Sequence, residues 1–218
     1  MNLSIEGKKA LVTGGSHGIG LAIKQGLKEE GVQVYSISRR EGYDVLRNDD
    51  MERATEQYKE IDILVNNVGG GGRWGTIPYH QTYYKVWDEV YRKNAKACYL
   101  LTCNSLPYMM EKQWGRVITI ASVFGKEGGG RPWFVAAKAA EIAMMKSFAL
   151  DKSYQQHNIT FNTVAPGAIY IPDKEMDDYE KYGDVKDVAN LVVFLCSNRA
   201  RWINGACIVI DGGFSKSF

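Results

Sequence analysis

The sequence predicts an α/β fold, in which a single parallel β-sheet is covered by helices on both of its faces. Short apolar runs rich in Val and Ile are typical of fully buried strands. Helical patterns separate these runs, as the crossover connections of a parallel sheet require. The predicted strands are Lys9–Thr13, Val32–Ile37, Ile61–Val65, Val117–Ala121, Ile159–Val164 and Ala206–Ile210.

The predicted helices lie between these strands. A chain of 218 residues can build one well-buried core, and no polar linker divides it. We therefore expect a single domain over residues 1–218. Two glycine-rich segments, Gly69–Gly75 and Gly125–Gly130, follow predicted strands and are expected to be loops. The helices are expected at Gly18–Glu30, Asp50–Tyr58, Tyr83–Lys112, Pro132–Gln155 and Val185–Ser197.

Composition narrows the possible partners. The 27 Lys and Arg residues nearly balance the 25 Asp and Glu residues, so nothing indicates nucleic-acid or membrane-surface binding. No apolar run reaches the roughly 20 residues of a membrane span, and no secretion signal is visible, so we expect a cytoplasmic protein. The four cysteines and three histidines lack ligand spacing, which favours reduced thiols and no metal site. Small molecules and further copies of this chain remain as the expected partners.

Three spaced glycines connect the first predicted strand to the first predicted helix. The segment Thr13–Gly20 has the spacing Gly-x-x-x-Gly-x-Gly, formed by Gly14, Gly18 and Gly20. Glycines at such a turn let backbone amides approach a pyrophosphate at the positive end of the helix. An ordinary tight turn between strand and helix is the alternative.

At this turn the sequence resembles the short-chain dehydrogenase/reductase family, whose motif reads Thr-Gly-x-x-x-Gly-x-Gly. The resemblance extends to the final strand and turn, Ile208–Gly213, and implies a Rossmann-type doubly wound sheet that binds a nicotinamide dinucleotide. It places Asp44 at the adenine edge. The other residues that it implies for the cofactor are Thr13, Gly14, Ser16, His17, Gly18, Ile19, Gly20, Asn66, Asn67, Gly69, Lys138, Pro166, Gly167 and Ile169.

The end of the second predicted strand bears on the choice of cofactor. It reads Ser38-Arg39-Arg40, without the carboxylate that grips the adenosine ribose in NAD enzymes. Two guanidinium groups can instead make charge-assisted bonds to a 2′-phosphate. We therefore predict NADP(H), the alternative being that both arginines are ordinary solvated charges.

Catalysis in this family uses Asn, Ser, Tyr and Lys, and three of the four have counterparts here. Asn94 would organise water, Ser122 would polarise the substrate oxygen, and Lys138 would hold the nicotinamide ribose hydroxyls. Each also has a simpler explanation. Asn94 could be structural, Ser122 could cap the chain after a strand, and Lys138 could be solvated and paired with Glu141.

The fourth catalytic position holds Phe134 instead of the family's Tyr, four residues before Lys138. A phenyl ring cannot transfer the proton, and a positioned acid or base contributes about 10²- to 10⁴-fold to rate. Candidate replacement donors are Ser122, a water held by Asn94 and Lys138, and Tyr170. Two functions stay open. The chain is either an oxidoreductase acting on a carbonyl or alcohol with an altered site, or a cofactor-binding protein without redox turnover. The second class includes a regulatory module, a non-redox lyase or dehydratase, and an inactivated Tyr-to-Phe variant.

Two loops near the expected pocket pair an arginine with a tryptophan: Arg73 with Trp74, and Arg131 with Trp133. Arginine binds carboxylate or phosphate in a two-pronged manner, and tryptophan offers a flat face to a ring. This pattern favours an anionic or carbohydrate-like substrate, although packing tryptophans and surface arginines would look the same.

The two longest predicted helices, Tyr83–Lys112 and Pro132–Gln155, carry more apolar surface than one face of a sheet can cover. Family members pair these helices between subunits. The resemblance therefore implies a homodimer or homotetramer.

Overall fold

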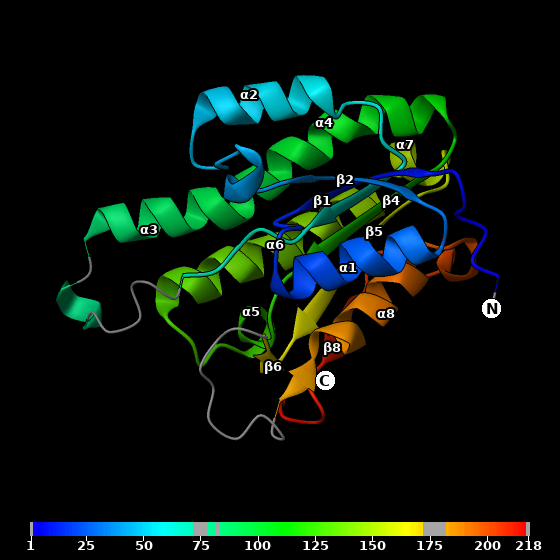
Figure 1. Ribbon diagram of the computed structural model, residues 1–218. Helices are drawn as coiled ribbons and strands as arrows, with labels where there is room; N and C mark the ends of the chain where they lie inside the picture. Colours follow the sequence, from blue (N-terminus) through cyan, green and yellow to red (C-terminus); the bar gives the residue numbers. More distant parts are fainter. Residues whose placement is uncertain (1, 72–77, 82, 172–181, 217–218) are drawn as a thin grey trace.

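A parallel β-sheet organises the chain in the computed structural model, which describes residues 2–71, 78–81, 83–171 and 182–216 (Figure 1). Six strands of this described part lie in the order β2-β1-β3-β4-β5-β8, and each neighbouring pair runs parallel. The predicted fold class is confirmed. The strands are β1 (Lys9–Thr13), β2 (Gln33–Ile37), β3 (Ile63–Asn66), β4 (Gly115–Ile120), β5 (Ile159–Pro166) and β8 (Cys207–Ile210).

Alternate side chains of the strands enter two separate cores, because successive residues of a strand face opposite sides of a sheet. Val12 and Val65 pack with α1 (Gly18–Glu29) and α8 (Val185–Leu195) on one face. Leu11 and Leu64 pack on the other face with α2 (Asn48–Gln57), α4 (Ala97–Glu111) and α6 (Pro132–Leu150). Figure 1 shows α1 and α8 on the side of the sheet opposite α2 and α4. Strands β3, β4 and β5 are therefore buried along their whole length, as predicted.

The helices differ from the prediction at three places. The expected helix Tyr83–Lys112 is α3 (Tyr84–Tyr91), a π-helical segment (Arg92–Lys96) and α4. The expected helix Pro132–Gln155 ends at Leu150, and α7 (Lys152–Gln155) begins anew at Asp151, whose side chain accepts a bond from the Ser153 amide. The expected loop Gly125–Gly130 begins inside a short helix, α5 (Val123–Glu127), which Ser122 caps.

The strand order defines where a ligand would bind. From β1 the chain adds β2 on one side of the sheet and β3 on the other, so the direction of strand addition reverses between β1 and β3. Ligands of open α/β sheets bind at such a point, outside the carboxyl ends of the strands. Thr13 and Asn66 end these two strands. β2 is the edge strand, so the residues that follow it lie at the border of the sheet.

A small second sheet follows β5. It pairs β6 (Ile169–Tyr170) with β7 (Gly183–Asp184), and the Asp184 side chain then caps α8. Within the described ranges, no helix combines the length and apolarity needed to cross a bilayer.

Candidate functional site

The turn between β1 and α1 can be built only with glycines. Gly14 and Gly18 have φ angles of +69° and +55°, in the left-handed region that disfavours other residues. A Cβ atom on Gly20 would lie 2.5 Å from the Asn67 side-chain nitrogen, and it would also collide with the carbonyl of Gly14. The motif therefore keeps the first turn of α1 in close contact with the strand ends.

Several hydrogen bonds hold this turn against the end of β3. The Thr13 hydroxyl accepts bonds from the backbone amides of Asn67 and Val68, both at 2.8 Å. The Asn67 side chain donates to the Thr13 carbonyl at 2.9 Å. The buried Asn66 side chain donates to Thr102 and Thr119, at 3.2 and 3.4 Å. Thr13 and Asn67 therefore hold the turn through backbone groups, and Asn66 joins β3 to α4 and β4 through side chains.

The turn fits the pyrophosphate of a dinucleotide. His17 is the N-cap of α1 in an extended conformation, and its side chain makes no capping bond to the helix. The first amides of α1 are thus available to an anion, which the helix dipole also favours. Ile171, just after β6, packs 3.3 Å from the position that a Cβ on Gly18 would take. The segment that contains Gly167 and Ile169 therefore reaches the same turn.

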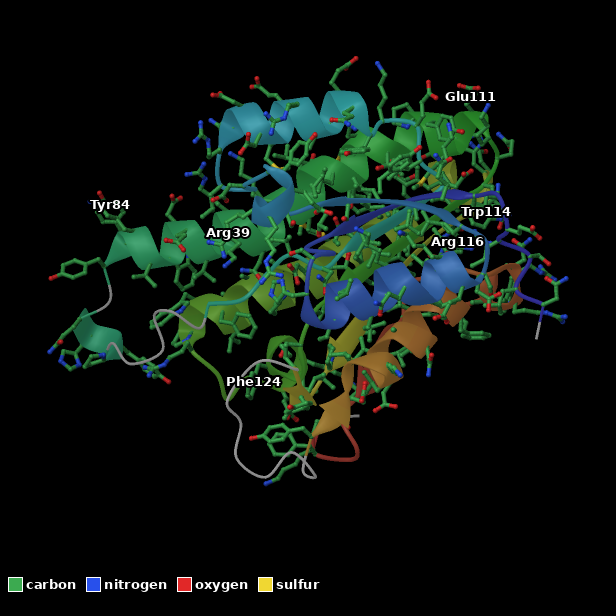
Figure 2. All side chains as sticks on the ribbon, in the orientation of Figure 1. Arg39, Tyr84, Glu111, Trp114, Arg116 and Phe124 are labelled. Atoms are coloured by element: carbon green, nitrogen blue, oxygen red, sulfur yellow. The ribbon has the colours of Figure 1, made fainter. Side chains whose placement is uncertain are left out.

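The residues after β2 form a charged cluster beside the turn. Arg39 and Arg40 are exposed, and Figure 2 labels Arg39. Arg40 Nη1 donates to the Ser16 carbonyl at 3.4 Å. Sequence reasoning missed Glu41, whose carboxylate accepts bonds from Ser36, Ser38 and Lys24. Partial burial acts to raise the pKa of Glu41, but these bonds outweigh it and lower the pKa below its usual value. A carboxylate therefore does stand beside the end of β2.

Asp44 begins the connection to α2. Its carboxylate accepts a bond from the Leu46 amide at 3.0 Å, and its own amide donates to Asp50 at 2.9 Å. These contacts fix the loop, and the predicted contact of Asp44 with adenine stays a prediction.

Lys138 lies buried at the centre of the candidate catalytic region. Its Nζ donates to the Ile120 carbonyl at 2.8 Å and to Glu141 Oε2 at 2.9 Å, and its side chain is 4% exposed. The alternative of a solvated pair with Glu141 is therefore wrong in one respect, because the pair exists but is buried. A Cβ on Gly69 would lie 2.8 Å from Nζ, so the lysine ends beside the loop after β3.

The π-helical segment aims Asn94 at this same loop. A π-turn inserts one extra residue into a helix and is frequent at functional sites. The Asn94 Oδ1 accepts from the Gly70 amide at 3.0 Å, and its Nδ2 donates to the carbonyls of Val90 and Gly70. A Cβ on Gly69 would lie 2.5 Å from Oδ1. Asn94 and Lys138 therefore both lie against Gly69, and their catalytic roles stay predictions.

Ser122 and Phe134 come from neighbouring elements. Ser122 is the N-cap of α5, and its Oγ accepts from the Phe124 amide at 3.2 Å. α5 packs tightly on α6, since a Cβ on Gly125 would lie 2.8 Å from Lys138 Cβ. The half-buried Phe134 ring has its centre 5.9 Å from Lys138 Nζ. An apolar ring thus stands one helical turn before the lysine.

The residues predicted to bind the substrate differ from one another in burial and contacts. Trp133 is 2% exposed and packs against Val86, Val90 and Ala137, which favours a packing role for its ring. Its indole N–H is buried and has no partner among the described residues. The Arg131 guanidinium lies 5.0 Å from the Tyr79 ring centre. Arg73 and Trp74 lie outside the described residues, and Tyr170 lies half-buried on β6.

The described residues contain no group of three or more His, Cys, Asp or Glu side chains placed to hold a metal ion.

Comparisons with known proteins agree with this geometry. A family model described as enoyl-(acyl carrier protein) reductase matches residues 43–215. The 3-oxoacyl-(acyl-carrier-protein) reductase FabG of Aquifex aeolicus is 31% identical over 98% of this chain and 99% of its own length. Zerumbone synthase of Zingiber zerumbet is 29% identical over 98% of this chain and 96% of its own length. A crystal structure of a dehydrogenase/reductase from Sinorhizobium meliloti 1021 has a TM-score of 0.83 and 28% identity, over 97% and 96% of the two chains.

The fold, the turn and the Asn94–Lys138 arrangement define a nucleotide-binding oxidoreductase. The chain belongs to the short-chain dehydrogenase/reductase family. This assignment confirms the predicted family and enzyme class, and it agrees with NADP(H) as the cofactor. Phe134 lies four residues before Lys138 in this sequence, and its correspondence to the family's catalytic Tyr stays a prediction.

Proposed function

We propose that this protein is an NADP(H)-dependent oxidoreductase that acts on a carbonyl or alcohol without a tyrosine proton donor. The convergence of Asn94 and Lys138 on Gly69 carries the proposal, because it preserves the family's support around the nicotinamide ribose. When bound, the cofactor supplies or accepts the hydride. Lys138, fixed by Ile120 and Glu141, keeps donor capacity for the ribose hydroxyls.

Ser122 is the proton donor that the local geometry favours. Its oxygen accepts a bond from the Phe124 amide, which leaves the hydroxyl hydrogen free to be donated and makes the hydroxyl more acidic. The Asn94 side chain is engaged with Gly70 and Val90, which argues against an important role in holding a catalytic water. In reduction, Ser122 would give its proton to the substrate oxygen as the hydride arrives.

The proposed substrate is anionic. Arg131 lies at the N-terminus of α6, three residues before Phe134, and stacks over Tyr79 and Trp133. A guanidinium held by aromatic rings is well placed to bind a carboxylate or phosphate. The names of two relatives refer to 3-oxoacyl-(acyl-carrier-protein), so 3-oxoacyl compounds and anionic keto sugars form the test set.

Isotope transfer tests this function directly. NADPH deuterated at C4 of the nicotinamide is incubated with the protein and each compound, and products are analysed by mass spectrometry. Deuterium in an alcohol product is expected for the wild type, and loss of this product with retained NADPH affinity is expected for Ser122→Ala. Tyr170→Phe tests the competing donor: the product should persist in this variant, and its loss there instead of in Ser122→Ala would assign the proton transfer to Tyr170. If NADPH binds but no compound in the set acquires deuterium, the protein is better described as a cofactor-binding module.

We also propose that the chain self-associates through α4 and α6. Tyr99 and Leu150 on these helices are 48% and 64% exposed, and Tyr99 stacks on Phe148 across them. Exposed aromatic and aliphatic groups of this kind are typical of interfaces between subunits. Light scattering should give the mass of a dimer or tetramer, and a monomeric mass at micromolar concentration would contradict the proposal.

A further inference from the structure

Three hydrogen-bond donors converge on the Glu41 carboxylate at the border of the sheet. Ser38 Oγ lies 2.7 Å from Oε2, and Lys24 Nζ lies 3.2 Å from Oε1, which also accepts from the Ser36 hydroxyl. Lys24 and Ser36 are themselves bonded at 2.8 Å. Two hydroxyls and an ammonium arranged in this way form an anion-binding site, and the chain's own carboxylate fills it.

This anion site adjoins the cofactor turn. A Cβ on Gly15 would lie 2.8 Å from Ser36 Cβ and 3.4 Å from Lys24 Cδ, so the site and the turn are in direct contact. Arg40 reaches from the same 3₁₀ helix, η1 (Arg39–Glu41), to the Ser16 carbonyl. The site therefore lies at the strand end where a Rossmann fold binds the 2′ position of the adenosine ribose.

The Glu41 side chain is placed so that it can move away from these three donors. Its side chain is 32% exposed and projects from a three-residue 3₁₀ helix beside the edge strand β2. Lys24 lies on α1, Ser36 lies on β2, and Ser38 is the N-cap of η1. A rotation of the Glu41 side chain would expose the three donors without moving the sheet.

We propose that Glu41 occupies the subsite of the cofactor's 2′-phosphate in the free protein and is displaced when NADP(H) binds. This inference rests on the proposed use of NADP(H). A phosphate carries more negative charge than the carboxylate and more acceptor oxygens, so it can take over the bonds from Lys24, Ser36 and Ser38. The two anions cannot share the site, because like charges at contact distance repel. Glu41 thus weakens NADP(H) binding selectively, and Lys24 strengthens it.

Cofactor titrations test this assignment without requiring turnover. NADPH and NADH are titrated by fluorescence, and 2′-AMP and 5′-AMP are used as competitors that differ in the position of phosphate. Glu41→Gln should tighten NADPH and 2′-AMP by at least about tenfold and leave NADH and 5′-AMP unchanged. Lys24→Met should weaken NADPH and 2′-AMP only. Glu29→Gln, an exposed residue at the end of α1, is the matched control and should change nothing.

The alternative results are distinguishable. If Glu41→Gln weakens NADH binding, the carboxylate holds the ribose hydroxyls, and the displacement proposal is wrong. If NADPH affinity does not change in this variant, Glu41 does not compete for the subsite, although the proposed function stands. If the wild-type protein binds neither NADPH nor NADH, the proposed function and this inference both fail.

Discussion

The Nζ atom of Lys138 lies 2.9 Å from Oε2 of Glu141, and the two side chains are only 4% and 2% exposed. Burial raises the pKa of the Glu141 carboxyl, and the nearby Lys138 charge counteracts this only in part. Taking a charge out of water is costly, so each member of such a pair depends on the other. The lysine at the predicted catalytic position is therefore held by an acid that lies outside the family's four catalytic positions.

Removing one member of this pair should destabilise the protein more than removing both. Lys138→Met leaves Glu141 buried without its partner and should lower the free energy of unfolding by about 3–5 kcal/mol. The double variant Lys138→Met/Glu141→Met should recover most of this loss. Urea denaturation measures both effects, with Lys146→Met, exposed on the same helix, as the control. Additive losses in the double variant would show that the pair is not coupled.

Arg116 should contribute to stability through carbonyl groups. It is fully buried on β4, and it donates to the Gly115, Asn158 and Ser197 carbonyls and to the Asn198 side chain (Figure 2). Burial lowers the pKa of its guanidinium to about 10, so it stays charged at neutral pH. Arg116→Met should lower the free energy of unfolding by about 2–4 kcal/mol, because buried acceptors lose their partner.

The control for Arg116 is Arg201→Met, at an exposed position after η6 (Asn198–Ala200). This variant should unfold within about 0.5 kcal/mol of the wild type. Equal stability of the two variants would mean that the Arg116 bonds are compensated elsewhere.

Cysteine reactivity should follow burial. Burial raises the pKa of both Cys98 and Cys196 to about 12, so neither forms the reactive thiolate at pH 8. Cys103 and Cys207 are half-buried. Mass spectrometry after brief treatment with a maleimide should find label on Cys103 or Cys207 and none on Cys98 or Cys196. Labelling of all four before unfolding would contradict the packing of α4 and α8.

Acid should remove the stabilisation contributed by Glu41. Its pKa is lowered in the folded state, so this stabilisation is present above the unfolded pKa and disappears as pH falls through the folded pKa. The stability difference between wild type and Glu41→Gln should therefore shrink from pH 7 towards pH 3. Denaturation curves at several pH values measure it. A difference that grows on acidification would contradict the charged network around Glu41.

The fold could be predicted from the sequence because its signals are local. The Val- and Ile-rich runs and the glycine turn each specify a conformation within a few residues, and all six strands were expected near their observed positions. The helix boundaries were less accurate. The π-helical turn at Asn94 depends on bonds to Gly70, which is distant in sequence, and no helical periodicity reports such bonds.

The site could be predicted only where family motifs mark it. Asn94 and Lys138 were predicted in this way, whereas Glu41 was missed because it lies just beyond the Ser38–Arg40 segment, where the acid of NAD enzymes is expected. The 3₁₀ helix that turns it back to Ser36 and Ser38 has no clear sequence signal. Trp133 looked like a stacking surface beside Arg131, but helix packing buries its ring. Burial of polar and aromatic groups depends on tertiary contacts, which spacing alone does not reveal.

We propose that a family catalytic site surrounds Phe134 and lacks only the phenol oxygen. The most direct measurement is the rate of NADPH-dependent reduction of the carbonyl set by Phe134→Tyr, with Phe134→Leu as the control. A hydroxyl placed one helical turn before Lys138 should raise kcat by about 10²- to 10⁴-fold over the wild type, and leucine should not. An unchanged rate in Phe134→Tyr, with NADPH still bound, would contradict the claim and place the chemistry elsewhere.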